Sequence, residues 1–445
     1  MIQRSIQSGR TFSSLGQLLS YAAPLCASML ACSADSITMG ENLEQAQLSA
    51  PLPSTSRCRE STIIDADVVV ENQEQLVELE GCTEVNGALT VLPFEAADLR
   101  PLYALTRVSG MVDLGGTSVI EVYDTRFRRK WLESLAGLES LESVGELRVS
   151  GLLANDVDAL SRLHSLGWPG MLRFDSAPNL VDLQGLRQLE GIRSLLISDC
   201  SALESLEPLT LPRGMDSIVL ASTPLTRLTS LELESLDDLT ITKTGLVNLD
   251  AFSGLTKIAG ELQLVDNLEL ENVDALDGLQ FVGDLDIGGC PGLRRLPEFT
   301  ELMRLDALGI YANDSLENVP TLPKLLSDAI EGDEYSGQRV GTLLLYRPSD
   351  IAIMYNPSLT SIKLSAGWFS AGRVAILNND ALARVEFTKQ RSFEQLLLGG
   401  NPLLESVELG VLGTIDSLGL RANPLLDEGV FDSVRTFERS DEINF

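Results

Sequence analysis

The sequence predicts an α/β repeat fold, a right-handed solenoid with one long parallel β-sheet. The strongest indication lies in residues 260–293, where Leu262 and Leu264 alternate with polar residues, as in a half-buried strand. Asn267 follows three residues after the strand, and apolar residues then recur at every third position. The pattern restarts at Leu285, 23 residues after Leu262. One unit of the fold is therefore a short strand followed by a wide apolar arc.

Strands of this kind recur along the chain, mostly 21 to 25 residues apart. A unit that consists of a strand, an Asn or Cys and a leucine-rich arc resembles the leucine-rich repeat. The convex side of that repeat is mostly irregular or short-helical. About fifteen strands, spaced about 4.8 Å apart, would form a sheet roughly 65–70 Å long. Each strand is located by its second apolar residue: Val70, Val91, Leu114, Val149, Phe174, Ile197, Leu220, Ile241, Leu264, Ile287, Ile310, Ile353, Ile376, Leu398 and Leu420.

Residues 1–31 have the organisation of an export signal, with Arg4 and Arg10 before the short apolar run Leu18–Ala31. The run is too short to span a bilayer stably. It ends in Met29–Cys32, which resembles a bacterial lipobox and implies that Cys32 is lipidated and becomes the first mature residue. Ordinary signal cleavage and an uncleaved structural start are the alternatives. Acyl chains on Cys32 would hold the protein at a membrane without a spanning helix.

The segment 32–57 that follows lacks periodicity and is rich in Ser, Ala and Pro. This composition is typical of a flexible tether. We therefore expect one folded unit over residues 58–445, joined by the tether to an anchor at a bacterial outer membrane or cell surface. Secretion without an anchor is the alternative location.

The start of the folded unit resembles a receptor L-domain, a leucine-rich module of surface receptors. The residues that carry the resemblance are Val68–Val70, Leu76, Leu79, Gly81–Thr83, Val85–Gly87 and Leu89–Val91. In such modules the cysteine after the first short helix pairs with one before the first strand, which implies a disulfide between Cys58 and Cys82. Export favours the oxidised state. Two free thiols are the alternative.

Two insertions interrupt the repeat, near residues 120–145 and 322–350. Insertions in solenoids emerge as loops that often carry binding, or they are tolerated surface variation. The first contains the densest basic and aromatic cluster of the chain, which could contact an anionic glycan or lipid or pair with nearby acids: Arg126, Arg128, Arg129, Lys130 and Trp131. At the C-terminal end, residues 429–437 are expected to form a short amphipathic helix over the last repeat.

Most of the recognisable repeat residues are expected to be scaffold. A buried side-chain amide after each strand can satisfy backbone groups that the turn directs inward. Cys200 and Cys290 occupy the same position and are interpreted as small buried thiols. Thr117, Thr223 and Thr244 occupy it elsewhere. The asparagines are Asn267, Asn313, Asn356, Asn379, Asn401 and Asn423.

Composition argues against several functions. The formal net charge of −31 repels phosphate backbones, so nucleic acid is not an expected partner. His164 is the single histidine, which argues against histidine-dependent nucleophilic catalysis and His-rich zinc sites. Nucleotide, zinc-protease, serine-hydrolase and calcium-loop motifs are missing from the sequence. We therefore expect no cofactor, no metal site, no catalytic residue and no enzymatic activity.

The remaining candidate site is the concave face of the sheet, at the residue between the two buried ones of each strand. In the first half of the chain these residues are mixed and polar, and in the last rungs they are small or apolar. An uncharged strip on so acidic a protein favours a partner surface, and a sheet face covered by the neighbouring insertion is the alternative. The candidate surface comprises Gly309, Tyr311, Ala352, Met354, Ala375, Leu377, Leu397 and Gly419.

These observations favour an exported, lipid-anchored surface protein that binds a protein ligand without catalysis. A protein ligand is preferred to a glycan because aromatic residues, which stack on sugars, make up only 5 % of the chain. A self-associating envelope protein that uses the apolar strip is one alternative. A glycan-binding protein, or a glycan hydrolase based on paired carboxylates, is the other.

Overall fold

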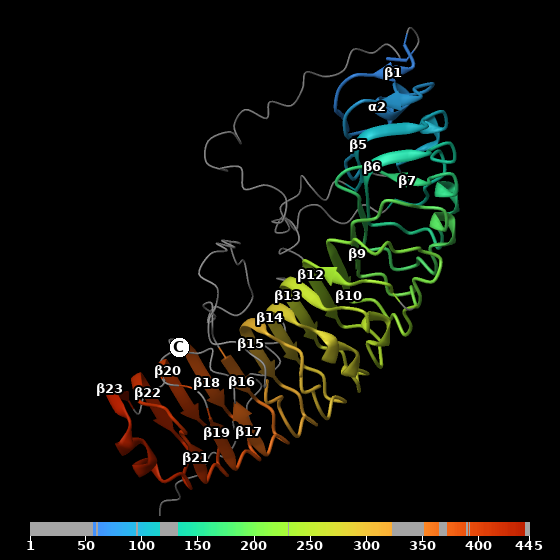
Figure 1. Ribbon diagram of the computed structural model, residues 1–445. Coiled ribbons are helices and arrows are strands. Elements are labelled where there is room, and N and C mark those ends of the chain that lie inside the picture. Colours follow the sequence, from blue (N-terminus) through green and yellow to red (C-terminus); the bar gives the residue numbers. More distant parts are fainter. Residues whose placement is uncertain are drawn as a thin grey trace, which may run out of the picture.

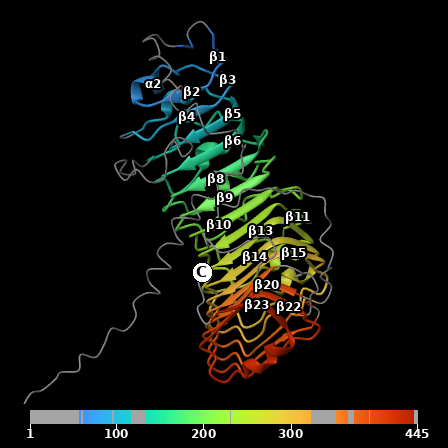
Figure 2. The same cartoon turned by 90° about the vertical axis from the view of Figure 1, so that its left-hand side faces the viewer.

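The computed structural model describes residues 57–440, apart from 59–60, 95–96, 116–131, 230, 323–350, 365–371, 389 and 391. Over these ranges the backbone winds into a parallel β-solenoid that curves into an arc (Figure 1). The strands of the long sheet line the inner, concave side of the arc, and loops and short helical turns lie on the outer side. Viewed onto the concave side, the strands are stacked in chain order (Figure 2). The predicted solenoid with a long parallel sheet is confirmed.

In the described ranges the main sheet contains 20 strands, against about fifteen predicted. Every predicted strand position lies within one of them. The principal strands are β2 (Val68–Val70), β4 (Leu89–Val91), β5 (Arg107–Leu114), β6 (Ser143–Ser150), β8 (Met171–Asp175), β9 (Ser194–Ser198), β10 (Ser217–Ala221), β12 (Asp238–Thr242), β13 (Lys257–Val265), β14 (Phe281–Gly288), β15 (Arg304–Tyr311), β16 (Ile351–Met354), β18 (Arg373–Leu377), β20 (Ser392–Gly399), β22 (Thr414–Arg421) and β23 (Arg435–Ser440).

The additional strands are short pieces that pair beside the longer ones. They are β1 (Ile63–Ile64), β3 (Glu84–Val85), β7 (Ser165–Leu166) and β11 (Ser235–Leu236). A separate three-stranded sheet lies in the C-terminal part of the arc and consists of β17 (Ser361–Leu364), β19 (Arg384–Phe387) and β21 (Ser406–Glu408). Such short pairings carry too little alternation to be recognised in the sequence.

The helical elements are short. They are α2 (Gln73–Val77), η1 (Arg100–Leu102), η2 (Asp158–Leu160), η3 (Gln184–Leu186), η4 (Asp250–Phe252), η5 (Asp274–Gly278) and η6 (Glu428–Ser433). Within the described ranges, each helix is too short or too polar for a transmembrane span. The predicted C-terminal helix over residues 429–437 is wrong in its second half. After η6 the chain extends into β23, because pairing with β22 satisfies its backbone better than an isolated helical turn.

A single hydrophobic core runs the length of the described solenoid. Leucines of the arc pack against the two inward residues of each strand, as in the rung of Leu262 and Leu276, both fully buried. Successive rungs approach closely where strands begin: a Cβ on Gly283 would lie 2.3 Å from the carbonyl oxygen of Gly260. Only glycine tolerates that approach, so packing against the preceding rung requires glycine at position 283.

The asparagine ladder is confirmed as scaffold. Oδ1 of Asn379 accepts from the backbone N–H of Asn356 at 3.1 Å, and Nδ2 of Asn379 donates to the carbonyl of Ile353 at 3.0 Å. Each asparagine thus satisfies backbone groups of the preceding rung. Cys290 fits the ladder through its own N–H, which donates to Oδ1 of the next asparagine. The same arrangement recurs at Asn267, Asn313, Asn356, Asn401 and Asn423.

A second column precedes this ladder and was not predicted. The residue before each ladder position has a positive φ, although most of these residues are not glycine. Its N–H donates to the last carbonyl of the next strand, as Tyr355 does to Leu377 at 3.0 Å. That bond holds the backbone in a conformation that non-glycine residues otherwise avoid. The column contains Ser176, Asp199, Ser222, Lys243, Asp266, Ala312, Tyr355, Asn378 and Ala422.

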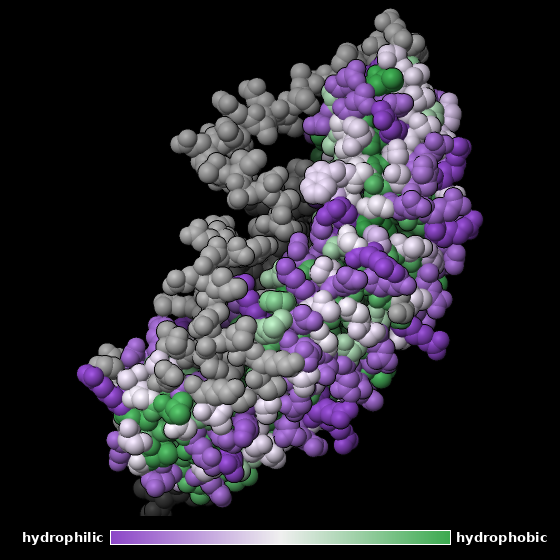
Figure 3. All heavy atoms as spheres, viewed as in Figure 1, coloured by the Kyte–Doolittle hydropathy of each residue, from purple (hydrophilic) through white to green (hydrophobic). Residues whose placement is uncertain are grey.

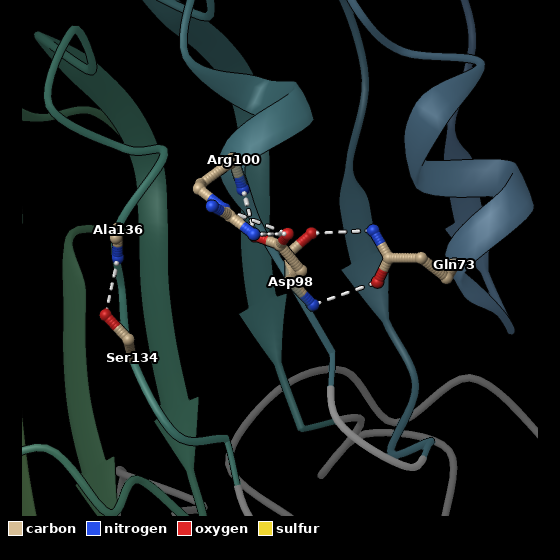
Figure 4. Close-up of polar contacts among 5 residues, drawn as sticks. All are labelled: Gln73, Asp98, Arg100, Ser134 and Ala136. Atoms are coloured by element: carbon tan, nitrogen blue, oxygen red, sulfur yellow. Dashed lines mark hydrogen bonds and ion pairs between the residues drawn. The ribbon is translucent and has the colours of Figure 1, made fainter.

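The N-terminal end of the solenoid is closed by covalent and polar contacts. Cys58 and Cys82 form a disulfide, as the receptor L-domain resemblance implies. The side chain of Gln73 in α2 exchanges two 2.9 Å hydrogen bonds with the backbone of Asp98, whose carboxylate pairs with Arg100 (Figure 4). That pairing lowers the pKa of Asp98. Nearby, the hydroxyl of Ser134 accepts from the backbone N–H of Ala136, two residues further along the chain, at 3.0 Å.

Candidate ligand-binding face

The concave face consists of outward side chains held in register by the parallel strands. The middle column runs Thr90, Asp113, Arg148, Arg173, Leu196, Val219, Thr240, Gln263, Asp286, Gly309, Ala352, Ala375, Leu397 and Gly419. This is the order predicted from the sequence. The chemistry changes along the column from charged, through mixed, to apolar.

The charged block lies on β5, β6 and β8. Arg148 forms an ion pair with Glu146 of its own strand. Arg173 lies beside it on the next strand, and its Nε is buried without a hydrogen-bond partner. Burial lowers the pKa of Arg173, while the nearby Asp175 opposes that shift. The block is therefore densely charged and partly removed from water.

Hydroxyl groups fix the acid of this block. Ser198 donates to Oδ1 of Asp175, and Ser150 donates to Oδ2 at 3.2 Å. These serines come from β9 and β6, the strands on either side of β8, so one carboxylate joins three consecutive rungs. The lateral order of the face is thus fixed by side chains as well as by the backbone.

The side chains of the apolar block are largely buried. Ala352, Met354, Leu377 and Leu397 form a hydrophobic cluster separate from the main core, with Tyr311 and Ala375 packed against it. The first four side chains are only 4–7 % exposed. The alternation places them on the concave face, and in the structure their side chains are largely buried there. The partner surface stays a prediction. In register on adjacent strands, apolar side chains cover one another.

Glycines at the border of this block make room for an aromatic ring. A Cβ on Gly288 would lie 2.1 Å from the ring of Tyr311, so this ring lies across the glycine of the preceding strand. Gly309 and Gly419 take the middle-column positions on β15 and β22. The predicted strip is therefore one packed surface, formed by the residues named from the sequence.

An exposed aromatic residue at the edge of the sheet was not predicted as a site. Trp168 lies between β7 and β8 and is 77 % exposed, more than any other large hydrophobic side chain in the described ranges. The guanidinium of Arg193 lies 5.2 Å from the centre of its ring. Arg193 is held by two hydrogen bonds to Asp216, at 2.9 and 2.6 Å. The available signal was a Trp-Pro pair between Gly167 and Gly170, outside the apolar periodicity.

The buried thiols and the histidine have structural surroundings. Cys200 and Cys290 are free and buried, as predicted, and burial raises the pKa of their thiols to about 12 and about 11. Nδ1 of His164 lies 3.1 Å from the carbonyl oxygen of Arg162. Among the described residues, His, Cys, Asp and Glu side chains do not come together in groups of three that could hold a metal ion.

Other predicted features lie outside the described residues. These are the lipidation site Cys32, the tether, the basic cluster Arg126–Trp131 and the second insertion over residues 323–350. The described end of the first insertion, from Leu132 to residue 145, is an ordinary rung: Leu135, Leu138 and Leu141 are buried in the core. Figure 3 shows hydrophilic residues spread over the visible flank of the described solenoid, without one concentrated site.

The sequence matches no protein-family model, and no curated protein matches it. The solved structures that are similar to this chain include three leucine-rich repeat proteins. InlJ from Listeria monocytogenes, a functional domain that includes a cysteine ladder, is 13 % identical, with 84 % of this chain and 70 % of that chain covered and a TM-score of 0.31. A leucine-rich repeat protein of Leptospira interrogans is 14 % identical, with 83 % and 99 % covered and a TM-score of 0.33.

The third structure, TLR13 in complex with ssRNA13, is 14 % identical, with 82 % of this chain and 63 % of that chain covered and a TM-score of 0.22. At these low scores the fold assignment rests on the strand register and buried leucine pattern of this chain. The fold is a solenoid of the leucine-rich repeat type.

Proposed function

We propose that this protein binds a protein ligand, without catalysis, through the concave face of its long sheet. The supporting observation is that the residue type varies in the middle column of the sheet but repeats in the core and ladder columns. Core and ladder positions repeat along the solenoid, whereas the middle column changes from Arg173 through Thr240 to Ala375. A hydrogen-bonded sheet presents these side chains in fixed order, so binding would cost little conformational entropy. Tyr311 and Ala375, the partly exposed members of the apolar strip, form the second part of the proposed contact surface.

The test is site-specific photo-cross-linking in the full-length protein. A photoreactive amino acid at Thr240 of the concave column should capture one protein, and the same residue at Val181 should not. Val181 is 54 % exposed, more than the partly buried Thr240, but it lies outside the sheet. Exposure alone would therefore favour capture at Val181. The captured protein, once purified, should bind with one-to-one stoichiometry. Equal capture at both positions, or failure of the purified protein to bind, would refute the proposal.

The proposal includes export and a lipid anchor on Cys32 at a bacterial surface. The Cys58–Cys82 disulfide supports export, because disulfides persist in oxidising compartments. The variant Cys32→Ser should move the full-length protein from the membrane fraction to the soluble fraction and abolish incorporation of a labelled fatty acid. Unchanged fractionation and labelling would rule out the anchor while leaving ligand binding untouched.

Self-association through the apolar strip is the weaker alternative. It requires an exposed apolar contact, but Met354, Leu377 and Leu397 are buried within one chain. Charge repulsion at a net charge of −31 also opposes pairing of two copies. Size-exclusion chromatography with light scattering should therefore give a monomer. A stable dimer that Leu397→Glu dissociates would favour the alternative.

A further inference from the structure

Among the described residues, Trp168 has the most exposed aromatic side chain. An indole buries 150–250 Å² when it is fully covered, so a ring that is 77 % exposed leaves most of that apolar area in water. Tryptophan and arginine are the residues that most often dominate binding energies at protein interfaces. An exposed ring of this kind is typical of the anchor residues of protein interfaces.

The orientation of the ring is set before binding. Arg193 stacks on Trp168, and Asp216 holds the guanidinium through two hydrogen bonds. The backbone joins these rungs as well: Arg193 N–H donates to Gly170 O at 2.8 Å, and Asp216 N–H donates to Arg193 O at 2.6 Å. A ring fixed in this way loses little rotamer freedom when a ligand contacts it.

The charges around the ring favour a cation. Asp216 neutralises Arg193, and Asp237 on the next rung adds a further carboxylate, since its N–H bonds the carbonyl of Asp216 at 2.7 Å. The stacked guanidinium shows that the ring surface accepts a cation in this setting. The net charge of −31 raises the local concentration of cationic ligands and repels anionic ones. The negative charge of the protein therefore favours binding of a basic peptide over an acidic one.

We propose that Trp168 anchors the protein ligand by taking a Lys or Arg side chain on the ring surface that Arg193 leaves exposed. The inference rests on the proposed function, because it specifies the chemistry of the same ligand. It places the anchor at the edge of the concave face, beside β8 and β9, in the rungs that carry Arg173 and Leu196.

The experiment measures binding of a triarginine peptide to the full-length protein. Trp168→Ala should weaken binding about fivefold, and Trp168→Phe should weaken it less, following the order of cation–π strength. Neither variant changes the net charge, so the loss reports the ring and excludes general attraction to an acidic surface. Tyr103→Ala is the matched control, because Tyr103 is another exposed aromatic, 55 % exposed, at the end of η1. It should bind like the parent.

A site-resolved measurement removes ambiguity about folding. The chain has three tryptophans, so an amide correlation spectrum contains three indole N–H signals. The signal missing in Trp168→Phe should be the one that moves when triarginine is added to the parent protein. Triglutamate should leave it in place. A signal that stays fixed with triarginine, or equal affinities of the parent and Trp168→Ala, would overturn the inference.

Two further outcomes separate this inference from the proposed function. Movement of the same indole signal with maltoheptaose but not with triarginine would assign the ring to a glycan and overturn the inference. If the partner captured at Thr240 still binds Trp168→Ala with parental affinity, the anchor is wrong and the concave binding face stands. If Thr240 captures nothing while the triarginine results hold, the ring is a cation site and the proposed function fails.

Discussion

Removal of one rung of the asparagine ladder should destabilise the protein locally and strongly. In Asn379→Ala, the N–H of Asn356 loses its acceptor and the carbonyl of Ile353 loses a donor, in a site with no solvent exposure. A buried polar group left without a partner costs about 1–3 kcal/mol, and the vacated volume adds a cavity term. We therefore expect a loss of about 2–5 kcal/mol in unfolding free energy.

The neighbouring Asn378 supplies a matched control. It is also an asparagine, but it is exposed and has a positive φ. Asn378→Gly should change stability by less than about 0.5 kcal/mol, because the site is exposed and asparagine, unlike alanine, tolerates the left-handed conformation that glycine would keep. Asn379→Cys should fall between the two, since the chain itself places Cys200 and Cys290 at this ladder position.

The assay combines urea denaturation with hydrogen exchange. Repeat proteins unfold in parts, so circular dichroism alone averages over rungs. Exchange at the amide of Asn356 reports the broken bond directly and should accelerate at least about 30-fold in Asn379→Ala, the factor that corresponds to about 2 kcal/mol. Unchanged exchange at Asn356, with a midpoint equal to that of Asn378→Gly, would show that the ladder contributes no net stability.

Three further changes test other parts of the structure. Cys82→Ser should lower the unfolding free energy by about 3 kcal/mol, because the lost disulfide closes a loop of 24 residues; equal urea midpoints with and without reductant would contradict this. Asp266→Asn should stabilise at pH 7 by less than about 1 kcal/mol after allowance for solvent screening, because burial raises the pKa of this half-buried acid. A raised folded pKa means that the carboxylate costs stability above it, so the gain should vanish as the pH falls towards 3 and persist if the reasoning is wrong. Ala422→Gly should raise the unfolding free energy by about 0.5–1 kcal/mol, because it relieves backbone strain, and a decrease would show that no strain is present.

The core and the ladder could be predicted from the sequence because they repeat. Leu264 and Asn379 lie where the period places them, since one pattern of burial is imposed at every rung. The disulfide could be predicted for a different reason, which is the resemblance of the sequence around Cys82 to a receptor L-domain. The C-terminal strand β23 was missed because its sequence permits a helix, and only pairing with β22 decides between the two.

The candidate site could be predicted only in part. Alternation identifies the side of the sheet on which Leu397 lies, but its exposure depends on neighbours from other rungs, which a single strand does not encode. Trp168 carries no periodic signal at all. Its importance follows from the contact with Arg193, which is 25 residues away and becomes visible only when the rungs are stacked. The sequence period predicts the core and ladder residues, whereas contacts between side chains of different rungs are seen only in the structure.

The separation between scaffold and binding columns also explains how the concave face can vary. Backbone groups behind the strands are satisfied by ladder residues such as Asn379, so these backbone groups do not depend on the middle column. Its side chains can therefore change from Arg173 to Ala375 while the strands keep their register. Beside the middle column, at the end of β8, Asp175 joins rungs through two serines. At such positions a change made to alter binding would also alter stability, and only the unjoined positions are free to specify a ligand.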